Sequence, residues 1–180
     1  MAAATLRYVV LLRAINVGKA RRVAMPRLRE ILTARGYGRV QTHLNSGNVL
    51  LDSSLSEAEL AEDLSTAIEQ EFGFAVPVVL RTGNELAAVV AHDPFGRTAT
   101  DPSRYSVTFL PVEPSADLVG ALPPVEGRGE YLVNGRELYL WLPDGMIESP
   151  MARWKWDRLL GTAGTNRNWN TVCRLAELAA

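Results

Sequence analysis

The segment Leu6–Arg13, LRYVVLLR, restricts the possible folds of this chain more than any other part of the sequence. Its alternating side chains predict a strand, and both faces of that strand are apolar in the middle. The first face holds Tyr8, Val10 and Leu12, and the second holds Val9 and Leu11. A strand with two apolar faces is expected where other elements cover both of its sides. The segment is therefore predicted to lie at the centre of a sheet.

Two helices and three further strands are expected in the rest of residues 6–80. Pro26 begins a helix that runs to Ala34. Ser56 and Glu59 form a capping box, which begins a longer helix up to about Phe72. The strands are expected at Val40–Leu44, Asn48–Leu51 and Ala75–Leu80. The resulting order, βαββαβ, is that of a ferredoxin-like α+β unit. In that topology the first and third strands are antiparallel neighbours, so Arg13–Asn16 would lie beside Ser46–Asn48.

The second half of the sequence gives a similar but less regular pattern. The expected elements are a strand at Tyr105–Leu110, a helix at Pro114–Leu122, a hairpin around Asn134-Gly135, and two helices at Pro150–Leu160 and Trp169–Leu178. This order predicts a second, degenerate ferredoxin-like half followed by two C-terminal helices. We therefore expect a ferredoxin-like N-terminal subdomain, residues 1–92, with a smaller α+β subdomain, residues 93–180, packed on it.

The composition excludes several classes of protein. One Cys and two His among 180 residues cannot form a disulfide framework or the usual zinc sites, so we expect no metal or cofactor and a reducing, cytoplasmic location. The apolar run Val9–Leu12 is too short for a membrane span or a signal sequence. A membrane is therefore not an expected partner.

Three polar segments stand out: Arg13–Lys19, Asn45–Asn48 and Arg167–Thr171, here called the first, second and third polar segments. They are rich in Arg, Asn, Gly, Ser and Thr, and they contain neither a carboxylate nor a Cys. Such residues suit the binding of an anion and suit acid–base or metal chemistry poorly. The candidate ligand-binding residues are Arg13, Asn16, Gly18, Lys19, Arg22, Ser46, Gly47, Asn48, Arg167, Asn168 and Asn170.

The distribution of charge also favours an anionic partner. Residues 1–51 hold nine Lys or Arg and a single acid, Glu30, whereas the remaining residues hold ten basic and nineteen acidic side chains. Such asymmetry raises the local potential. The alternative is that the two halves of the chain attract each other.

The three polar segments, taken as LLRAINVG, NSGNV and TNRNWNTV, resemble those of the bacterial "domain of unknown function 1697" family, in the same order along nearly the whole chain. This sequence departs from the family pattern at Ala14, where the family usually has Gly, and at Ser149-Pro150-Met151, which lacks the usual Ser-Lys/Arg-Leu. The resemblance implies a ferredoxin-like α+β protein and implies no activity.

Each polar segment also has a purely structural interpretation. The first can be a flexible loop with solvated basic residues, and it does not match a phosphate-binding P-loop, because Arg13 stands at the first Gly position and Ala20 at the hydroxyl position. The second can be a hairpin turn whose Asn side chains bind their own backbone. The third can begin the last helix, whose N-terminus would attract an anion, or it can tie the C-terminal tail to the sheet.

Other residue types give few catalytic candidates. Cys173 is expected to be a buried, inert thiol. His43 is the one candidate base. If Trp154 and Trp156 lie on one helix, they cannot share a face, so one of them is expected to be more exposed.

Three functions therefore remain open. The first is binding of an anionic ligand, either a phosphorylated small molecule or a nucleic-acid backbone, at a rim formed by the three polar segments. The second is an enzyme with a small-molecule pocket between the halves, and the third is a structural or interaction protein. Base stacking on the sheet is disfavoured, because strand one offers only Tyr8 and the third strand offers no aromatic side chain. The sequence leaves the oligomeric state open.

Overall fold

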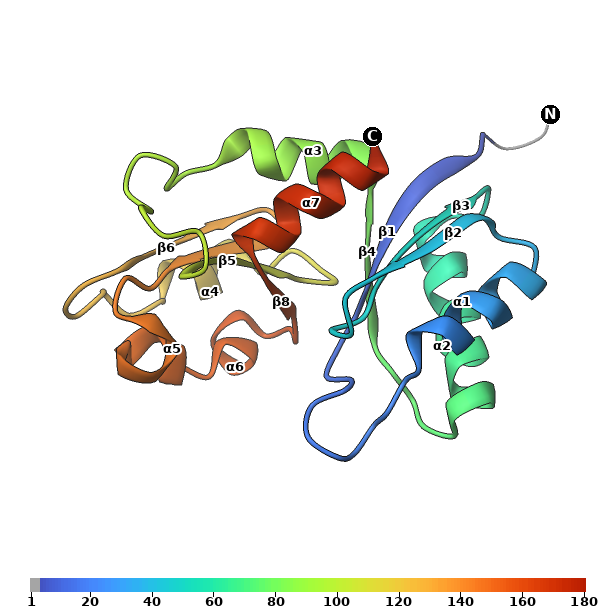
Figure 1. Ribbon diagram of the computed structural model, residues 1–180. Coiled ribbons are helices and arrows are strands. Elements are labelled where there is room, and N and C mark those ends of the chain that lie inside the picture. The colour runs from blue at the N-terminus through green and yellow to red at the C-terminus, as the bar shows by residue number, and fades with distance from the viewer. Residues whose placement is uncertain (1–3) are drawn as a thin grey trace. The chain divides into compact units, whose positions relative to one another are not determined.

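A computed structural model describes residues 4–180 (Figure 1). Its backbone contacts divide the chain into an N-terminal unit, which contains residues up to Ala87 together with Leu175–Ala180, and a C-terminal unit, Ala88–Arg174. Each unit has one four-stranded antiparallel sheet and accompanying helices, so the α+β class is confirmed. Within the described residues no helix is both long enough and apolar enough to cross a membrane.

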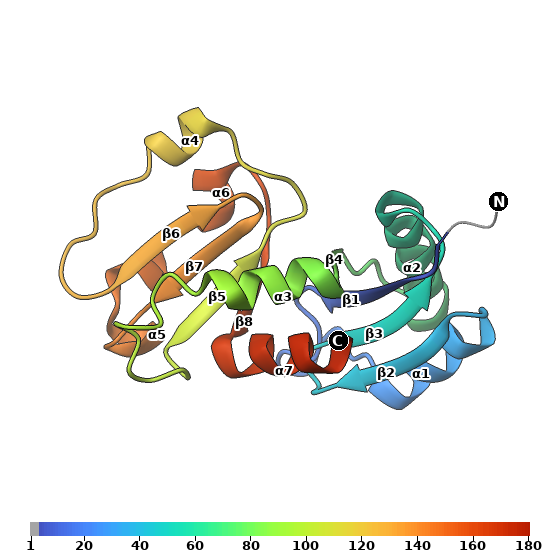
Figure 2. The same cartoon turned by 90° about the horizontal axis from the view of Figure 1, so that it is seen from above.

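The N-terminal unit has the predicted ferredoxin-like topology. It contains β1 (Leu6–Leu12), α1 (Met25–Ala34), β2 (Gly38–His43), β3 (Asn48–Ser53), α2 (Glu57–Phe72) and β4 (Val78–Thr82), followed by α3 (Gly83–His92), whose second half belongs to the C-terminal unit. The strand order is β2-β3-β1-β4, so β1 is central as expected. Figure 2 shows α1 and α2 beside this sheet, and both helices pack on the same face of β1.

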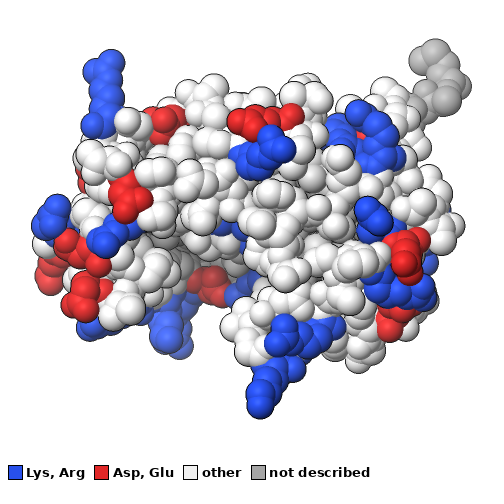
Figure 3. Space-filling model, in the orientation of Figure 1, with Lys and Arg blue, Asp and Glu red and all other residues white. Residues whose placement is uncertain are grey.

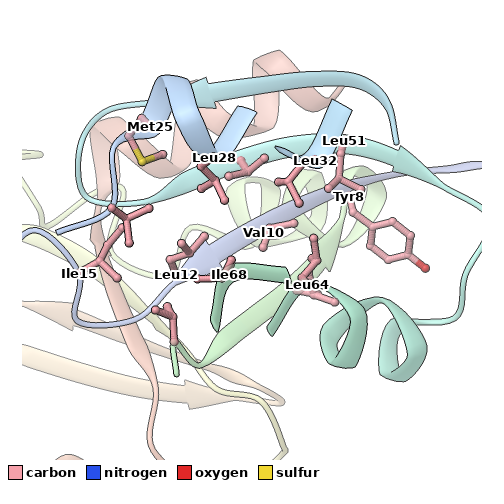
Figure 4. Packing of buried hydrophobic residues seen from close by; sticks show 14 of the residues in the cluster. Tyr8, Val10, Leu12, Ile15, Met25, Leu28, Leu32, Leu51, Leu64 and Ile68 are labelled. Carbon is pink, nitrogen blue, oxygen red and sulfur yellow. The ribbon is translucent and has the colours of Figure 1, made fainter. Parts of the chain in front are cut away.

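Both faces of β1 are buried, as its sequence predicts. Tyr8, Val10 and Leu12 point toward the helices, where they pack against residues such as Leu28 and Leu64 (Figure 4). On the opposite face Val9 and Leu11 have no exposed surface. Burying an apolar side chain of this size is worth about 1.5–3 kcal/mol, so β1 is a main source of stability for the unit.

Local signals account for the limits of the long helix α2. Its N-cap residue, Ser56, accepts a hydrogen bond from the Glu59 amide, and the Glu59 side chain accepts one from the Ser56 amide, which completes the predicted capping box. At the other end Gly73 adopts a left-handed conformation, with φ of 79°. Such a conformation favours glycine, so the helix ends there.

The C-terminal unit repeats the strand order of the first. It contains β5 (Tyr105–Phe109), α4 (Ala116–Gly120), β6 (Glu130–Asn134), β7 (Glu137–Trp141), α5 (Gly145–Glu148), a 3₁₀ helix η1 (Pro150–Arg153), α6 (Trp156–Leu160), β8 (Thr165–Asn168) and the first half of α7 (Trp169–Ala179). The strand order β6-β7-β5-β8 corresponds to β2-β3-β1-β4. The second half is thus more complete than predicted, because β8 supplies the fourth strand.

Two sequence predictions for the C-terminal unit are wrong. Residues 150–160 do not form one helix, because Trp154 has an extended backbone and separates η1 from α6. This break lets Trp154 and Trp156 lie together, with ring centroids 5.2 Å apart and with similar, partial exposure. Thr165–Asn168 is a strand paired with β5, not the start of the last helix.

The expected burial of Cys173 is also wrong. The thiol is half-buried, whereas its neighbours Val172 and Leu175 on α7 are fully buried. The buried face of α7 passes through Val172, Leu175 and Ala179.

Candidate functional site

The loop that joins β1 to α1, residues 13–24, contains the first polar segment and no acidic residue. Three of its non-glycine residues, Ala14, Asn16 and Arg21, have a left-handed backbone with φ between 53° and 55°. Each such residue costs free energy relative to a right-handed conformation, except where a local hydrogen bond offsets the cost. The loop is thus held in one specific conformation by contacts that can be identified.

Asn16 provides the central contact of this loop. Its Nδ2 donates to the carbonyl oxygens of Val23, at 3.0 Å, and of Asn45, at 2.7 Å, while its Oδ1 accepts from the Val23 amide at 2.9 Å. The Val23 contacts close the loop, and the Asn45 contact ties it to the turn between β2 and β3. Both Nδ2 hydrogens and the Oδ1 of Asn16 take part in these bonds, so its side chain holds the loop in place.

The first and second polar segments therefore lie together, as predicted. Leu11 of β1 pairs with Asn48 of β3, and the Leu12 amide donates to the Gly47 carbonyl at 2.8 Å. Asn48 has no exposed surface, and its Nδ2 donates to the His43 carbonyl and to the Ser46 hydroxyl. Burial of Asn48 removes it from contact with any ligand in solution. His43, the one candidate base, contributes only a backbone acceptor to this cluster.

Arg21 also belongs to the framework of the loop. Its guanidinium donates to the carbonyl oxygens of Ala14 and Ala75 and lies 5.2 Å from the centre of the Phe74 ring. Arg21 therefore ties the loop to the segment that precedes β4. Lys19 and Arg22 are the other exposed cations of the loop, and Arg13, at its start, is half-buried.

Most other cations of the N-terminal unit pair with nearby acids. Arg7 and Arg39 both bind Asp52, and Arg35 binds Asp63. These hydrogen bonds hold the pKa of both carboxyl groups below their usual range. The unit as a whole carries ten Lys or Arg and ten Asp or Glu. The excess positive charge of residues 1–51 is therefore balanced by acidic residues in the rest of the unit. Figure 3 shows basic side chains at the bottom of the view, where the β1–α1 loop lies.

The third polar segment belongs to the C-terminal unit. Arg167 is only 7% exposed on β8, where its Nη1 donates to the Thr165 hydroxyl and to the Asn166 carbonyl, both at 2.8 Å. Burial lowers the pKa of Arg167 to about 10, so the guanidinium remains charged at neutral pH. Asn168 accepts a hydrogen bond from the Thr171 amide and thus begins α7, and Asn170 is exposed on the first turn.

Strand β8 changes the role expected for this segment. Arg167 and Asn168 lie on β8 and precede the first turn of α7, and Asn168 caps the N-terminus of that helix. The contacts within the N-terminal unit bring together the first and second segments, and the third is built into the other sheet. The prediction of one rim from all three segments stays a prediction.

A groove on the C-terminal sheet is the feature that sequence analysis missed. It has a volume of about 600 Å³ and is bordered by side chains of β5, β7, β8 and the segment between α5 and α6. Trp154 and Trp156 form one wall, and Thr108 and Asn166 lie on the sheet. The pair of tryptophans was visible in the sequence, but the expectation of a continuous helix placed them on different faces.

Ala14 offers a direct test of strain in the β1–α1 loop. Its φ of 54° suits glycine, and a left-handed conformation costs other residues about 1–2 kcal/mol. Glycine adds freedom to the unfolded chain, which offsets about 0.4–1 kcal/mol. We expect Ala14→Gly to raise the free energy of unfolding by about 0.5–1 kcal/mol in urea titrations.

Ala20 is the matched control for this prediction, because it lies in the same loop and does not have a positive φ. The variant Ala20→Gly gains only unfolded-state freedom and should lower stability by about 0.4–1 kcal/mol. If the two variants shift stability in the same direction, the loop does not store strain at Ala14.

Comparisons with known proteins agree with this fold. A family model described as "Protein of unknown function (DUF1697)" matches residues 6–139. Among solved structures, the chain is similar to the conserved bacterial protein SP0830 from Streptococcus pneumoniae, with a TM-score of 0.80 and 22% sequence identity. The match covers 98% of this chain and 100% of that one. At this identity the likeness shows the fold alone. No curated protein matches the sequence.

Proposed function

Because the chain belongs to the bacterial DUF1697 family, whose function is unknown, we propose from the geometry that it binds phosphate groups at the β1–α1 loop. The observation that supports this proposal is the absence of acidic residues from the chain before Glu30, together with the exposure of Lys19 and Arg22 on an ordered loop. Exposed cations attract phosphate oxygens, and the loop itself contains no carboxylate that would compete for them. Both cations lie on the same short loop, three positions apart in the sequence.

The shape of the loop favours a nucleic-acid backbone over a phosphorylated small molecule. Small ligands are mostly bound in concave pockets that bury the greater part of their surface. Lys19 and Arg22 are instead exposed on a loop whose middle is open, since Val17 is 75% exposed. An extended polyanion can contact such cations one phosphate at a time.

The test measures binding of a short, fluorescein-labelled, single-stranded oligonucleotide by fluorescence anisotropy at several salt concentrations. Removal of both cations, Lys19→Ala with Arg22→Ala, should weaken binding at low salt by roughly tenfold or more. The slope of log K against log salt should become flatter by about 1.4, because each lost contact to a single strand contributes about 0.7. Thermal stability should be unchanged, since both side chains are exposed.

Arg29→Ala serves as the control, because Arg29 is an exposed cation of α1 outside the loop. It should leave the slope close to that of the parent protein. Pyrophosphate that binds as tightly as the oligonucleotide would instead favour a phosphorylated small molecule. If the parent protein binds neither probe, the proposal is wrong, and the first two polar segments serve only to connect the loop with the turn.

A further inference from the structure

The groove of the C-terminal unit arises because short helices cover its sheet incompletely. The face that carries Leu138, Leu140 and Leu142 packs against the covering segments through residues such as Met151 and Leu160. Helices α4 and α6 have only five residues each, and α4 has no buried residue. The corresponding face of the N-terminal sheet is covered by helices of 10 and 16 residues. Part of the C-terminal face is therefore left open as a groove of about 600 Å³.

The floor of this groove changes from apolar to polar across the sheet. Its apolar side is formed by Leu140 and Leu142, and its polar side by Thr108 of β5 and Asn166 of β8, which pair with each other. Asn166 donates through Nδ2 to the hydroxyls of Ser106, at 3.0 Å, and Thr108, at 2.9 Å. These two bonds hold the amide in place at the polar side of the groove, where its Oδ1 can accept a hydrogen bond.

One wall of the groove is a rigid aromatic cluster. The rings of Trp154 and Trp156 both meet the Tyr131 ring edge-on, at 5.8 and 5.4 Å between centroids. The Trp156 indole donates to the Met151 carbonyl at 3.0 Å, and the Tyr131 hydroxyl donates to the Pro123 carbonyl at 3.0 Å. Because these bonds fix the rings, the wall offers flat apolar surface without the entropic cost of ordering it.

The charged residues at the mouth select the sign of the ligand. Lys155 and Arg158 border the groove with a single carboxylate, Asp157, and all three side chains are exposed. An aromatic wall alone would also suit a cation. Two cations against one carboxylate make the mouth net positive and therefore favour an anionic group. Met146, which is 64% exposed, adds apolar surface at the edge.

From these features we infer that the groove binds a small, planar aromatic molecule that carries an acidic group. The rings would lie against Trp154 and Trp156, a ring N–H or amino group would donate to Asn166 Oδ1, and the acidic group would face Lys155 and Arg158. The volume matches that of pockets that hold ligands of this size, about 300–1,000 Å³. The groove belongs to the C-terminal unit and the β1–α1 loop to the N-terminal unit, and neither proposal depends on the other.

Two fluorescent probes with related ring systems test this inference on the full chain. The first, 8-anilinonaphthalene-1-sulfonate, is an aromatic anion, and the second, N-phenyl-1-naphthylamine, lacks the sulfonate. We expect saturable binding of both probes by the parent protein, with tighter binding of the anion. Added salt should weaken binding of the anion and leave binding of the neutral probe unchanged or stronger, because salt screens only the charged contact.

Charge reversal locates the site. The pair Lys155→Glu and Arg158→Glu should raise the Kd of the anionic probe roughly tenfold and change that of the neutral probe by less than about twofold. The control Arg97→Glu reverses an exposed charge of the same unit outside the groove and should leave both values unchanged. The inference is overturned if the parent protein does not bind the anion saturably, if salt has no effect, or if the reversal affects both probes equally. The salt titration decides the matter even if the reversed variant does not fold.

Discussion

Replacement of Gly47 by Ala is expected to destabilise the protein by about 3–5 kcal/mol, because two separate costs add at this position. Its φ of 88° is a left-handed conformation that side chains rarely adopt. A Cβ atom placed there would lie 2.8 Å from Leu12 Cβ and 2.7 Å from Ile15 Cδ1, both in the buried core. At about 2–4 °C per kcal/mol for a chain of this length, the melting temperature should fall by roughly 6–20 °C.

Gly36 separates the two costs. Its φ of 93° is similar to that of Gly47, but a Cβ atom there would meet nothing within 4 Å. Gly36→Ala should therefore cost only about 1–2 kcal/mol, the penalty of the backbone conformation. Urea titrations of both variants measure the difference. Equal losses would show that the β2–β3 turn can move away from β1, and that the contact between the first two polar segments is loose.

Loss of the Asn16 side chain is the second change with a large expected effect. Asn16→Ala removes three hydrogen bonds and leaves the Val23 amide and carbonyl with no side-chain partner, although Val23 is only 2% exposed. A buried polar group that loses its partner costs about 1–3 kcal/mol. In addition, Asn tolerates the left-handed φ of 55° better than Ala does. We expect a total loss of about 2–4 kcal/mol in the free energy of unfolding.

Asn45 provides the control for Asn16. It joins the same contact only through its backbone carbonyl, and its side chain is exposed. Asn45→Ala should therefore change stability by less than about 0.5 kcal/mol. A similar small effect of Asn16→Ala would mean that water replaces the lost amide, and that other residues hold the loop.

Regular hydrophobic patterns made the N-terminal unit predictable. The alternation of Tyr8, Val10 and Leu12 marked β1, and the Ser56–Glu59 capping box marked the start of α2. From these elements followed the topology, and from the topology followed the contact between the first and second polar segments. The contact was thus predicted, whereas the bonds of Asn16 were not, because they depend on the left-handed backbone of the loop.

Polar elements and tertiary context explain what the sequence did not reveal. Strand β8, TNRN, has no apolar side chain, so its alternation of buried Thr165 and Arg167 with exposed Asn166 and Asn168 gives no hydrophobic signal. Its conformation depends on pairing with β5, far away in sequence. Likewise, the aromatic groove depends on the break between η1 and α6. That break lies at Trp154 and Lys155. Neither residue is a Gly or Pro, so no helix-breaking residue type marks the break in the sequence.

The division of α7 between the two units has a consequence for the order of folding. The N-terminal unit is discontinuous, since it consists of residues up to Ala87 and of Leu175–Ala180. At the junction of these parts, the Ala179 carbonyl lies so close to Gly83 that a Cβ atom there would be 2.7 Å away. During synthesis the first sheet leaves the ribosome long before these last residues exist. The unit that is made first can therefore be completed only last, and its early form must remain unaggregated until the whole C-terminal unit has been synthesised.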